Sequence, residues 1–357
     1  MGSESVLEGR LVAETLLSLL SEYSPPGREE AATRVFMERA MYLGLEAWRD
    51  EAGNVYASTS RRGPWLLALI GHIDTVPGWV EPRVSGNIVY GRGAVDAKGP
   101  LASMLHAAAA AGKGVIVAGL VGEEDDSRGA KLLLEKGVPA RMVIIGEPTG
   151  GDGIAIGYRG SYKLRVICTA SGGHSSAPWM GDSALDKVLA LIERLETKHP
   201  GGSIWKPSIA VTGLCTSMTR NVIPTRAEAW LDARVPPGHR SAELASRSLR
   251  IIEDAGCMGE VVDTVEPVRV NPASPVPRSL QRAMLRTGIK PRPVVKAGTS
   301  DMNLLAPAVD SIAAFGPGDP SLSHTPHERV SEAELEAAAK IYLWAFMELK
   351  RIAGSSG

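Results

Sequence analysis

The sequence predicts an α/β protein with a mostly parallel sheet, into which a smaller ferredoxin-like α+β domain is inserted. Three continuous apolar runs, residues 65–70, 115–121 and 142–145, are typical of buried parallel strands. Each run leads to a glycine and then to a histidine or glutamate. After Tyr158 the runs give way to alternating strands and amphipathic helices. The length of 357 residues is sufficient for two domains.

The first domain is expected to open with two helices. Residues 5–21 and 28–43 carry apolar side chains at three-to-four spacing, and the prolines and glycine of residues 24–27 interrupt that pattern. An alanine-rich helix is predicted over residues 98–111, between the first two apolar runs. This is the place of a crossover helix, because parallel strands cannot be joined by a tight turn.

Residues 159–272 are assigned to the inserted domain. Their pattern gives the order β-α-β-β-α-β, which is the ferredoxin-like arrangement. The predicted elements are strand 161–169, helix 182–197, strand 208–214, strand 226–234, helix 241–255 and strand 260–265.

The chain is then expected to return to the first domain. Pro272, Pro275 and Pro277 mark this return, and a helix, a strand at 311–315, a loop and a final helix at 332–352 follow. The first domain therefore comprises residues 1–158 and 273–357.

Composition excludes several classes of function. The net charge of −1 argues against nucleic acid or an anionic membrane as partner, since both favour a basic excess. No apolar stretch has the length of a membrane helix, and the N-terminus lacks the pattern of a secretory signal. The three cysteines Cys168, Cys215 and Cys257 have no metal or redox spacing. We therefore expect buried, reduced thiols in a cytoplasmic protein.

Acidic and imidazole side chains follow the predicted strands. We expect them to converge, because the carboxyl ends of parallel strands share one edge of a sheet. So many carboxylates would repel one another unless divalent cations lay between them. Histidine with carboxylates suits zinc, with cobalt or manganese as alternatives, and a bridging carboxylate suits two ions. The candidate residues are His72, Asp74, Asp96, Glu123, Glu124, Glu147 and His324.

Each candidate also has an ordinary structural explanation. His72 alone would more often be a structural histidine, Glu123 and Glu124 a solvated acidic pair, and Asp96 the cap of the following helix. These explanations lose weight because the same placement, an apolar strand, a glycine and then a metal-binding residue, occurs three times.

At these positions the sequence resembles a known family, the zinc-dependent aminoacylases and carboxypeptidases that include acetylornithine deacetylase and succinyl-diaminopimelate desuccinylase. The similar segments cover nearly the whole chain in the family's order. They are residues 71–77, 91–100, 122–125, 146–149, 172–176, 221–224, 232–238 and the pair His324 and Glu328. The resemblance implies a catalytic domain with two metal ions and an inserted lid or dimerisation domain.

The resemblance also assigns the metal ligands. His72 and Glu147 would bind one ion, Glu124 and His324 the other, and Asp96 would bridge the two. Zinc is the expected metal, with cobalt possible. The remaining histidines considered, His199, His239 and His327, are expected at the surface, with His327 as the rival of His324.

Four further residues receive roles by the same resemblance. Asp74 would hydrogen-bond His72 and fix its tautomer. Glu123 would be the general base that takes a proton from water and passes it to the leaving amine. His174, with Asn221 nearby, would donate a hydrogen bond to the oxyanion, often from the partner subunit of a homodimer. Without the resemblance, His174 is better explained as a loop histidine held by its neighbouring serines.

Substrate binding is assigned to the inserted domain and to a later loop. Arg234 resembles an arginine that grips the substrate carboxylate, a task suited to a bidentate guanidinium. A surface salt bridge is the alternative for this arginine. Gly298, Thr299 and Ser300 would offer backbone groups to the substrate.

One subgroup of the family is especially similar, on residues 23–29, 296–303 and 322–328. It releases lysine or ornithine from the small acidic amino-group carrier protein LysW in lysine and arginine biosynthesis. A protein-borne substrate predicts basic residues at the mouth of the site, for which the candidates are Arg92, Lys98, Arg159 and Lys163.

Three other functions stay open at this point. The same chemistry would serve a small substrate, namely N-acetylornithine, N-acetyl-lysine or N-succinyl-diaminopimelate. A dipeptidase or carboxypeptidase is disfavoured by Glu147, where aminopeptidase relatives tend to carry aspartate. A non-catalytic binding module is disfavoured because every expected ligand and the base are present.

Overall fold

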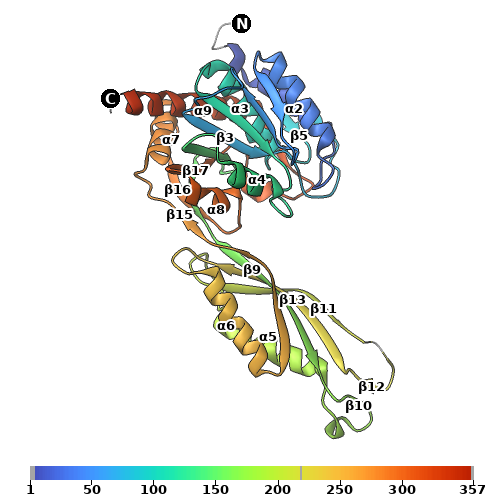
Figure 1. Cartoon of the computed structure of the whole chain (residues 1–357). Coiled ribbons are helices and arrows are strands. Elements are labelled where there is room, and N and C mark those ends of the chain that lie inside the picture. The colour runs from blue at the N-terminus through green and yellow to red at the C-terminus, as the bar shows by residue number, and fades with distance from the viewer. Residues whose placement is uncertain (1–4, 218, 355–357) are drawn as a thin grey trace. The chain divides into compact units, whose positions relative to one another are not determined.

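The computed structural model describes residues 5–217 and 219–354, which form two compact units (Figure 1). The first unit runs to Ile156 and also contains Val270–Val294 and the chain from Leu304 onward. The second unit consists of Gly157–Arg269 and Val295–Asn303. The catalytic and lid roles predicted for residues 1–158 with 273–357 and for 159–272 stay predictions.

A mixed sheet with a parallel core organises the first unit. Its core has the order β6-β3-β7-β17, with every neighbouring pair parallel. These strands are fully buried apart from the first residue of β7, which is why their sequences are continuously apolar. Their bounds are β3 Leu67–His72, β6 Val115–Leu120, β7 Met142–Gly146 and β17 Ser311–Phe315.

Antiparallel strands extend this core on both sides. Strand β2 pairs with β6 and carries β1, and β8 pairs with β17 and is followed by β15, with β16 also on β8. The sequence analysis did not predict these strands, because most of them are short. Their bounds are β1 Glu46–Arg49, β2 Val55–Ser58, β8 Gly153–Tyr158, β15 Val268–Arg269 and β16 Arg292–Lys296. The mixed, mostly parallel α/β class is confirmed.

Helices cover this sheet, and α3 is deeply buried. Its alanines allow close contact with α1 and α9, and Lys98 to Ala108 are all buried. The bounds are η1 Ser5–Leu7, α1 Gly9–Leu20, α2 Glu30–Tyr42, α3 Lys98–Ala111, α4 Arg128–Lys136, α7 Pro275–Arg286, α8 Asp301–Leu305, η3 Ala306–Ala308, η4 Pro320–Leu322 and α9 Glu332–Gly354. Figure 1 shows α3 and α9 within this unit.

A small antiparallel sheet also belongs to the first unit. Its order is β18-β5-β4, with bounds Arg329–Ser331, Ile88–Tyr90 and Arg83–Ser85. Val89 and Val330, the middle residues of β5 and β18, are buried, whereas Val84 of β4 is 45% exposed. Strands β5 and β18 therefore pack one face on the core, and β4 forms the exposed edge.

The second unit has the predicted ferredoxin-like plan. Its sheet has the order β11-β13-β9-β14 and is antiparallel throughout, and α5 and α6 pack on one face. A two-stranded ribbon of β10 and β12 extends from it. The bounds are β9 Gly160–Thr169, β10 Gly173–His174, η2 Pro178–Met180, α5 Ala184–Lys198, β11 Ser208–Thr216, β12 Val222–Ile223, β13 Arg226–Val235, α6 Ser241–Asp254 and β14 Cys257–Val265.

The expectation of three buried, reduced thiols is wrong. Cys168 and Cys257 form a disulfide, and Cys215 is free and exposed. The two bonded cysteines are opposite each other in the register of β9 and β14, with Cα atoms 4.5 Å apart. That separation lies within the range that a disulfide can bridge. The sequence hid the pair because 89 residues separate its members.

One histidine also differs from expectation. His199 is buried, and both of its ring nitrogens have partners. Its Nδ1 donates to the carbonyl of Leu195, and its Nε2 accepts from the Tyr162 hydroxyl at 2.5 Å. His106, which the sequence analysis did not consider, is buried against Thr15 and the Val6 carbonyl. Among the helices of residues 5–217 and 219–354, none is long and apolar enough to cross a membrane.

Candidate metal centre

The predicted convergence at the sheet edge is present in the first unit. His72 is the last residue of β3, Glu123 and Glu124 follow β6, and Glu147 follows β7. Since β6, β3 and β7 are parallel neighbours, their carboxyl ends bring these side chains to one edge.

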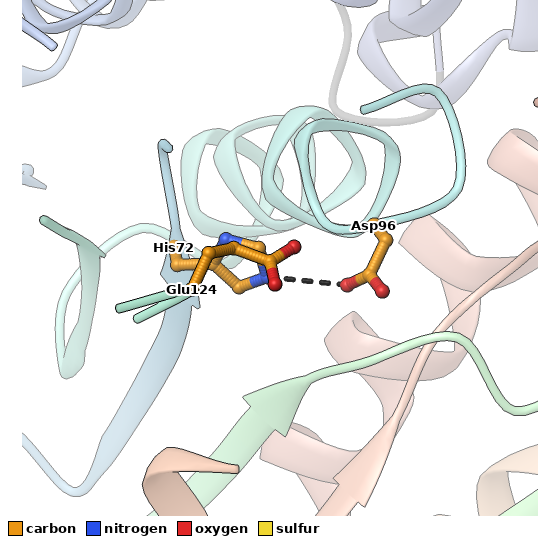
Figure 2. Close-up of side chains that lie close together, drawn as sticks. All are labelled: His72, Asp96 and Glu124. Atoms are coloured by element: carbon orange, nitrogen blue, oxygen red, sulfur yellow. Dashed lines mark hydrogen bonds and ion pairs between the residues drawn. The ribbon is translucent and has the colours of Figure 1, made fainter. Parts of the chain in front are cut away.

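Three side chains from separate segments come together there (Figure 2). One ligand atom from each of His72, Asp96 and Glu124 lies within 4.8 Å of the other two, a grouping that could hold a metal ion. The Nε2 atom of His72 lies 3.1 Å from Oδ1 of Asp96. His72 is only 2% exposed, and Asp96 reaches it from the turn before α3.

His324 supplies a second imidazole to these carboxylates. Its Nε2 lies 3.1 Å from Oε1 of Glu124 and 3.5 Å from Oδ2 of Asp96. Its backbone adopts a φ of 65°, in the left-handed region that non-glycine residues seldom visit. The fold therefore holds His324 at the site in a strained backbone conformation. Its rival His327 is exposed, and its backbone N–H donates to the Thr325 hydroxyl.

The electrostatic potential at the site is strongly negative. Burial by itself lowers the pKa of His72, but the hydrogen bond to Asp96 and the charges of Glu123, Asp74 and Asp96 outweigh it and raise that pKa well above its usual value. The hydrogen bond to Glu124 raises the pKa of His324, against the opposing effect of burial. Carboxylates gathered in this way favour positive charge at the site, which a divalent cation can supply.

The donor set fits a divalent metal ion. The Nδ1–H of His72 donates to the backbone carbonyl of Asp74 at 2.9 Å, and a carbonyl oxygen can only accept. Nδ1 therefore carries a proton, and the lone pair of Nε2 is directed toward the carboxylates. Imidazole and carboxylate ligands of this kind suit zinc and cobalt.

Asp74 holds the segment that carries Glu123 and Glu124. Its carboxylate accepts from the backbone N–H of Glu123 at 3.2 Å and of Glu124 at 3.0 Å. The same carboxylate lies 3.7 Å from Nδ1 of His72, so the carbonyl of Asp74, rather than its side chain, makes the hydrogen bond to the ring. Asp74 thus connects the strand end of β3 with the turn after β6.

A buried ion pair joins two other segments of the site. Arg92 donates from Nη1 to Oε1 of Glu328 at 2.5 Å, and the side chains are 9% and 1% exposed. Glu328 also accepts from the backbone N–H groups of Gly93 and Val95, and Arg92 donates to the carbonyl of Thr325. The turn leading to Asp96 is therefore tied to the loop of His324. The sequence analysis matched both segments to the family without pairing these residues.

Three of the basic residues expected at a pocket mouth are buried, so that prediction is wrong for them. Arg92 is held by Glu328, the Nζ of Lys98 donates to the carbonyls of Leu19 and Glu22, and Arg159 is 6% exposed. Burial lowers the pKa of Lys98 to about 7. Lys163 is exposed, and its ammonium lies 3.6 Å from a carboxylate oxygen of Asp263. Arg92, Lys98 and Arg159 therefore stabilise loops and strand ends in the interior of the protein.

His174 and Asn221 are neighbours in the second unit. His174 ends β10, opposite Val222 of β12, and the N–H of Ser175 donates to the Asn221 carbonyl. The backbone N–H of Ser176 donates to Nδ1 of His174 at 3.1 Å. Nδ1 is therefore an acceptor, and the neutral ring carries its proton on Nε2. The exposed imidazole thus offers Nε2–H as a donor.

The remaining predicted residues also lie in the second unit. Arg234 forms an ion pair with Asp232, with Nε 2.8 Å from Oδ1 and Nη2 3.0 Å from Oδ2. Gly298 is exposed, Thr299 is half-buried, and Ser300 is buried with its N–H donating to Oδ1 of Asn303. The roles of these residues in substrate binding stay predictions.

Comparison with known families now decides the relationship. Residues 68–348 match the model of peptidase family M20/M25/M40. The chain belongs to this family. It is also 37% identical over 356 residues to LysW-lysine/LysW-ornithine hydrolases of Saccharolobus islandicus and Saccharolobus solfataricus, with 98% of this chain and 99% of each relative covered.

A third relative comes from Aeropyrum pernix. It is 42% identical over 349 residues, with 96% of this chain and 97% of the relative covered. It is named as a provisional LysW-lysine/LysW-ornithine hydrolase. Family and relatives identify this M20 protein as a hydrolase that acts on amide bonds.

Solved structures of M20 proteins share the fold. A tripeptidase from Staphylococcus aureus superimposes with a TM-score of 0.82 at 20% identity, covering 96% of this chain and 99% of that one. An M20 metallo-carboxypeptidase from Sulfolobus solfataricus gives 0.78 at 19% identity, covering 96% and 99%. At this identity the likeness shows the architecture, a catalytic domain with an inserted domain, and not the substrate.

Proposed function

We propose that this M20 hydrolase releases lysine or ornithine from the amino-group carrier protein LysW, in lysine or arginine biosynthesis. Relatives named for this activity match the chain from end to end. The observation that carries the proposal is the grouping of His72, Asp96 and Glu124, which could hold a metal ion where strands β3 and β6 end. The amide bond between carrier and amino acid is the bond to be cleaved.

Two divalent metal ions are proposed at this site, with zinc preferred over cobalt. His72 and Glu147 would hold one, Glu124 and His324 the other, and Asp96 both. When bound, such ions polarise a carbonyl group and lower the pKa of a coordinated water toward about 7. The negative potential that raises the pKa of both histidines supports cation binding here.

Glu123 is the proposed general base. It follows β6 next to Glu124, and the Asp74 carboxylate fixes the peptide N–H groups of both residues. Glu123 would take a proton from the attacking water as the new C–O bond forms. It would return that proton to the amino nitrogen as the C–N bond breaks, so the products are a carboxylate and a free amino group.

His174 is proposed to donate Nε2–H to the oxyanion, from the partner subunit of a homodimer. The Ser176 N–H supports this role, because it keeps Nδ1 unprotonated and leaves the proton on the outward Nε2. Arg234 is proposed to bind the substrate carboxylate, which would replace the carboxylate of Asp232 as its partner. Asn221 and the backbone of Gly298, Thr299 and Ser300 would complete the substrate contacts. We place the enzyme in the cytoplasm, where amino-acid biosynthesis takes place.

The test is a hydrolysis assay on the metal-loaded enzyme. The substrates are LysW carrying lysine or ornithine, N-acetylornithine, N-acetyl-lysine and N-succinyl-diaminopimelate. We expect the carrier-linked forms to be preferred. Glu123→Gln should keep the metal content and melting temperature while kcat falls by about three orders of magnitude or more, since only the proton carrier is removed.

Two results would contradict the proposal. Preference for a small acyl amino acid would be consistent with the proposed metal site but would reject the carrier protein as part of the substrate. Near-normal kcat in Glu123→Gln would remove Glu123 from the mechanism. Chelation with EDTA serves as the control for metal dependence, and restoration by zinc or cobalt identifies the active metal.

A further inference from the structure

The small sheet of the first unit carries two arginines and a tyrosine in one row. In the register of β4, β5 and β18, Arg83 and Arg329 are both paired with Tyr90. Residues paired in this way project from the same face of a sheet. Val89 and Val330 of the next position are buried, so the row of Arg83, Tyr90 and Arg329 projects from the opposite, outer face. We call this row the arginine strip.

The two guanidinium groups of the arginine strip are exposed and available. Arg83 lies over the Tyr90 ring at 4.4 Å from its centroid, and Arg329 makes a long hydrogen bond of 3.4 Å to the His327 carbonyl. In the part of the chain that the structure describes, neither forms an ion pair with a carboxylate. Hydrogen bonds from Ser321 mainly lower the pKa of Asp319, and the charge of Arg329 lowers it less.

The arginine strip adjoins the metal centre through the chain. Tyr90 is followed by Arg92 and Arg329 is preceded by Glu328, so the buried ion pair of the site begins where the strip ends. The Gly91 N–H also donates to the Glu328 carbonyl. Asp96 and His324 are therefore six and five residues from the strip. Because six residues of extended chain span at most about 22 Å, a protein bound on the strip would lie within reach of the metal centre.

From this placement we propose that the arginine strip is the docking surface for an acidic protein, the carrier of the proposed substrate. The inference rests on the proposed function. If the scissile amide joins an amino acid to a protein, that protein must contact the surface beside the metal centre. Arginine and tyrosine are favoured in the centre of protein interfaces, and exposed guanidinium groups without acidic partners bind carboxylates bidentately.

The test is the double variant Arg83→Ala/Arg329→Ala in the metal-loaded enzyme. We expect KM for the carrier-linked amino acid to rise about tenfold, with kcat within twofold of wild type, because docking is weakened and the metal centre is intact. The inhibition constant of the free amino acid product should not change, since it binds without the carrier. Added salt should raise KM of the wild type more than that of the variant.

Two companion variants make the result specific. Arg286→Ala removes another exposed arginine of the first unit that lies over an aromatic ring, 4.6 Å from the centroid of Trp344 but outside the small sheet, and should leave KM unchanged. Arg83→Lys/Arg329→Lys keeps the charge and should recover part of the affinity.

Each negative result has its own meaning. An unchanged KM in the double alanine variant, or an equal rise in Arg286→Ala, would overturn the docking surface and leave the proposed function standing. Failure of the wild type to cleave carrier-linked substrate would reject the proposed function itself, before any variant is compared.

Discussion

At the scale of single residues, the surroundings of two buried histidines of the first unit shift their pKa values in opposite directions. Carboxylates surround His72, and despite burial its pKa is raised well above the usual value. Burial, with a smaller effect from the charge of Arg39, lowers the pKa of His106 to about 4, and its ring nitrogens bond to a hydroxyl and a carbonyl. Since both residues are almost inaccessible, the neighbouring groups decide the charge.

His106 therefore makes stability depend on pH. In the unfolded chain histidine titrates near pH 6.5, whereas folded His106 titrates near 4, so the unfolded state binds more protons between these values. Its stabilising contribution is present above pH 6.5 and is lost as pH falls toward 4. Between pH 7.5 and 5, we expect wild type to lose roughly 2 kcal/mol more than His106→Asn. The measurement is urea unfolding in the presence of a chelator.

The exposed His239 provides the matched control for this experiment. His239→Asn should follow the pH profile of the wild type, because it leaves the buried His106 in place. If His106→Asn keeps the same pH slope as wild type, the buried neutral form assigned to His106 is wrong.

At the scale of elements, one glutamate organises two loops. Glu328 accepts from Arg92, Gly93 and Val95, and so fixes the turn before α3, while Arg92 reaches across to the carbonyl of Thr325. Burial raises the pKa of Glu328, and the hydrogen bond from Arg92 opposes this effect. The positions of Asp96 and His324 thus depend on a pair that joins the two chain segments leading to them.

Breaking this pair should weaken metal binding. We expect Arg92→Met and Glu328→Gln each to lower metal affinity about 10- to 100-fold, as other residues that orient metal ligands do. Each should also reduce the free energy of unfolding of the metal-free protein by about 3–5 kcal/mol, because one buried charge is left without its partner. Titration calorimetry with zinc and denaturant unfolding measure the two effects.

The exposed ion pair of Arg141 and Asp310 supplies the comparison. Arg141→Met should change neither zinc affinity nor, by more than about 1 kcal/mol, the free energy of unfolding. Zinc affinity that stays at the wild-type level in Glu328→Gln would show that Asp96 and His324 keep their places without the buried pair.

At the scale of the whole molecule, the groups assigned to catalysis are divided between two units. The metal ligands and Glu123 belong to the first unit, and His174, Asn221 and Arg234 belong to the second. A homodimer in which each chain supplies His174 to its partner is part of the proposed function. The exposed edge strand β11 of the second unit offers backbone groups through which such a dimer could form.

Subunit complementation tests this arrangement. His174→Ala and Glu123→Ala should each be inactive, and a mixture that has exchanged subunits should recover about a quarter of wild-type activity. Half of randomly reassorted dimers are mixed, and each mixed dimer holds one complete site. The readout is hydrolysis after subunit exchange, with exchange itself followed by native mass spectrometry of differently tagged chains. Mixed dimers without activity would show that His174 acts within its own chain.

The sequence by itself determined the main strands, the inserted ferredoxin-like plan and the candidate metal ligands. It could do so because buried parallel strands demand continuous apolar runs, and their carboxyl ends share an edge. His72, Glu124 and Glu147 are therefore visible as residues that follow such runs. The short antiparallel strands were missed because three or four residues carry too little periodicity.

Only the tertiary structure decided contacts between residues far apart in the chain. The Cys168–Cys257 disulfide and the Arg92–Glu328 pair each depend on strand register or loop packing, across 89 and 236 residues. It also decided which charges are buried: Lys98 reads as a surface residue in the sequence but lies inside, held by two carbonyls. Local pattern specifies an element and its faces, whereas the partners of a side chain are set by which elements meet.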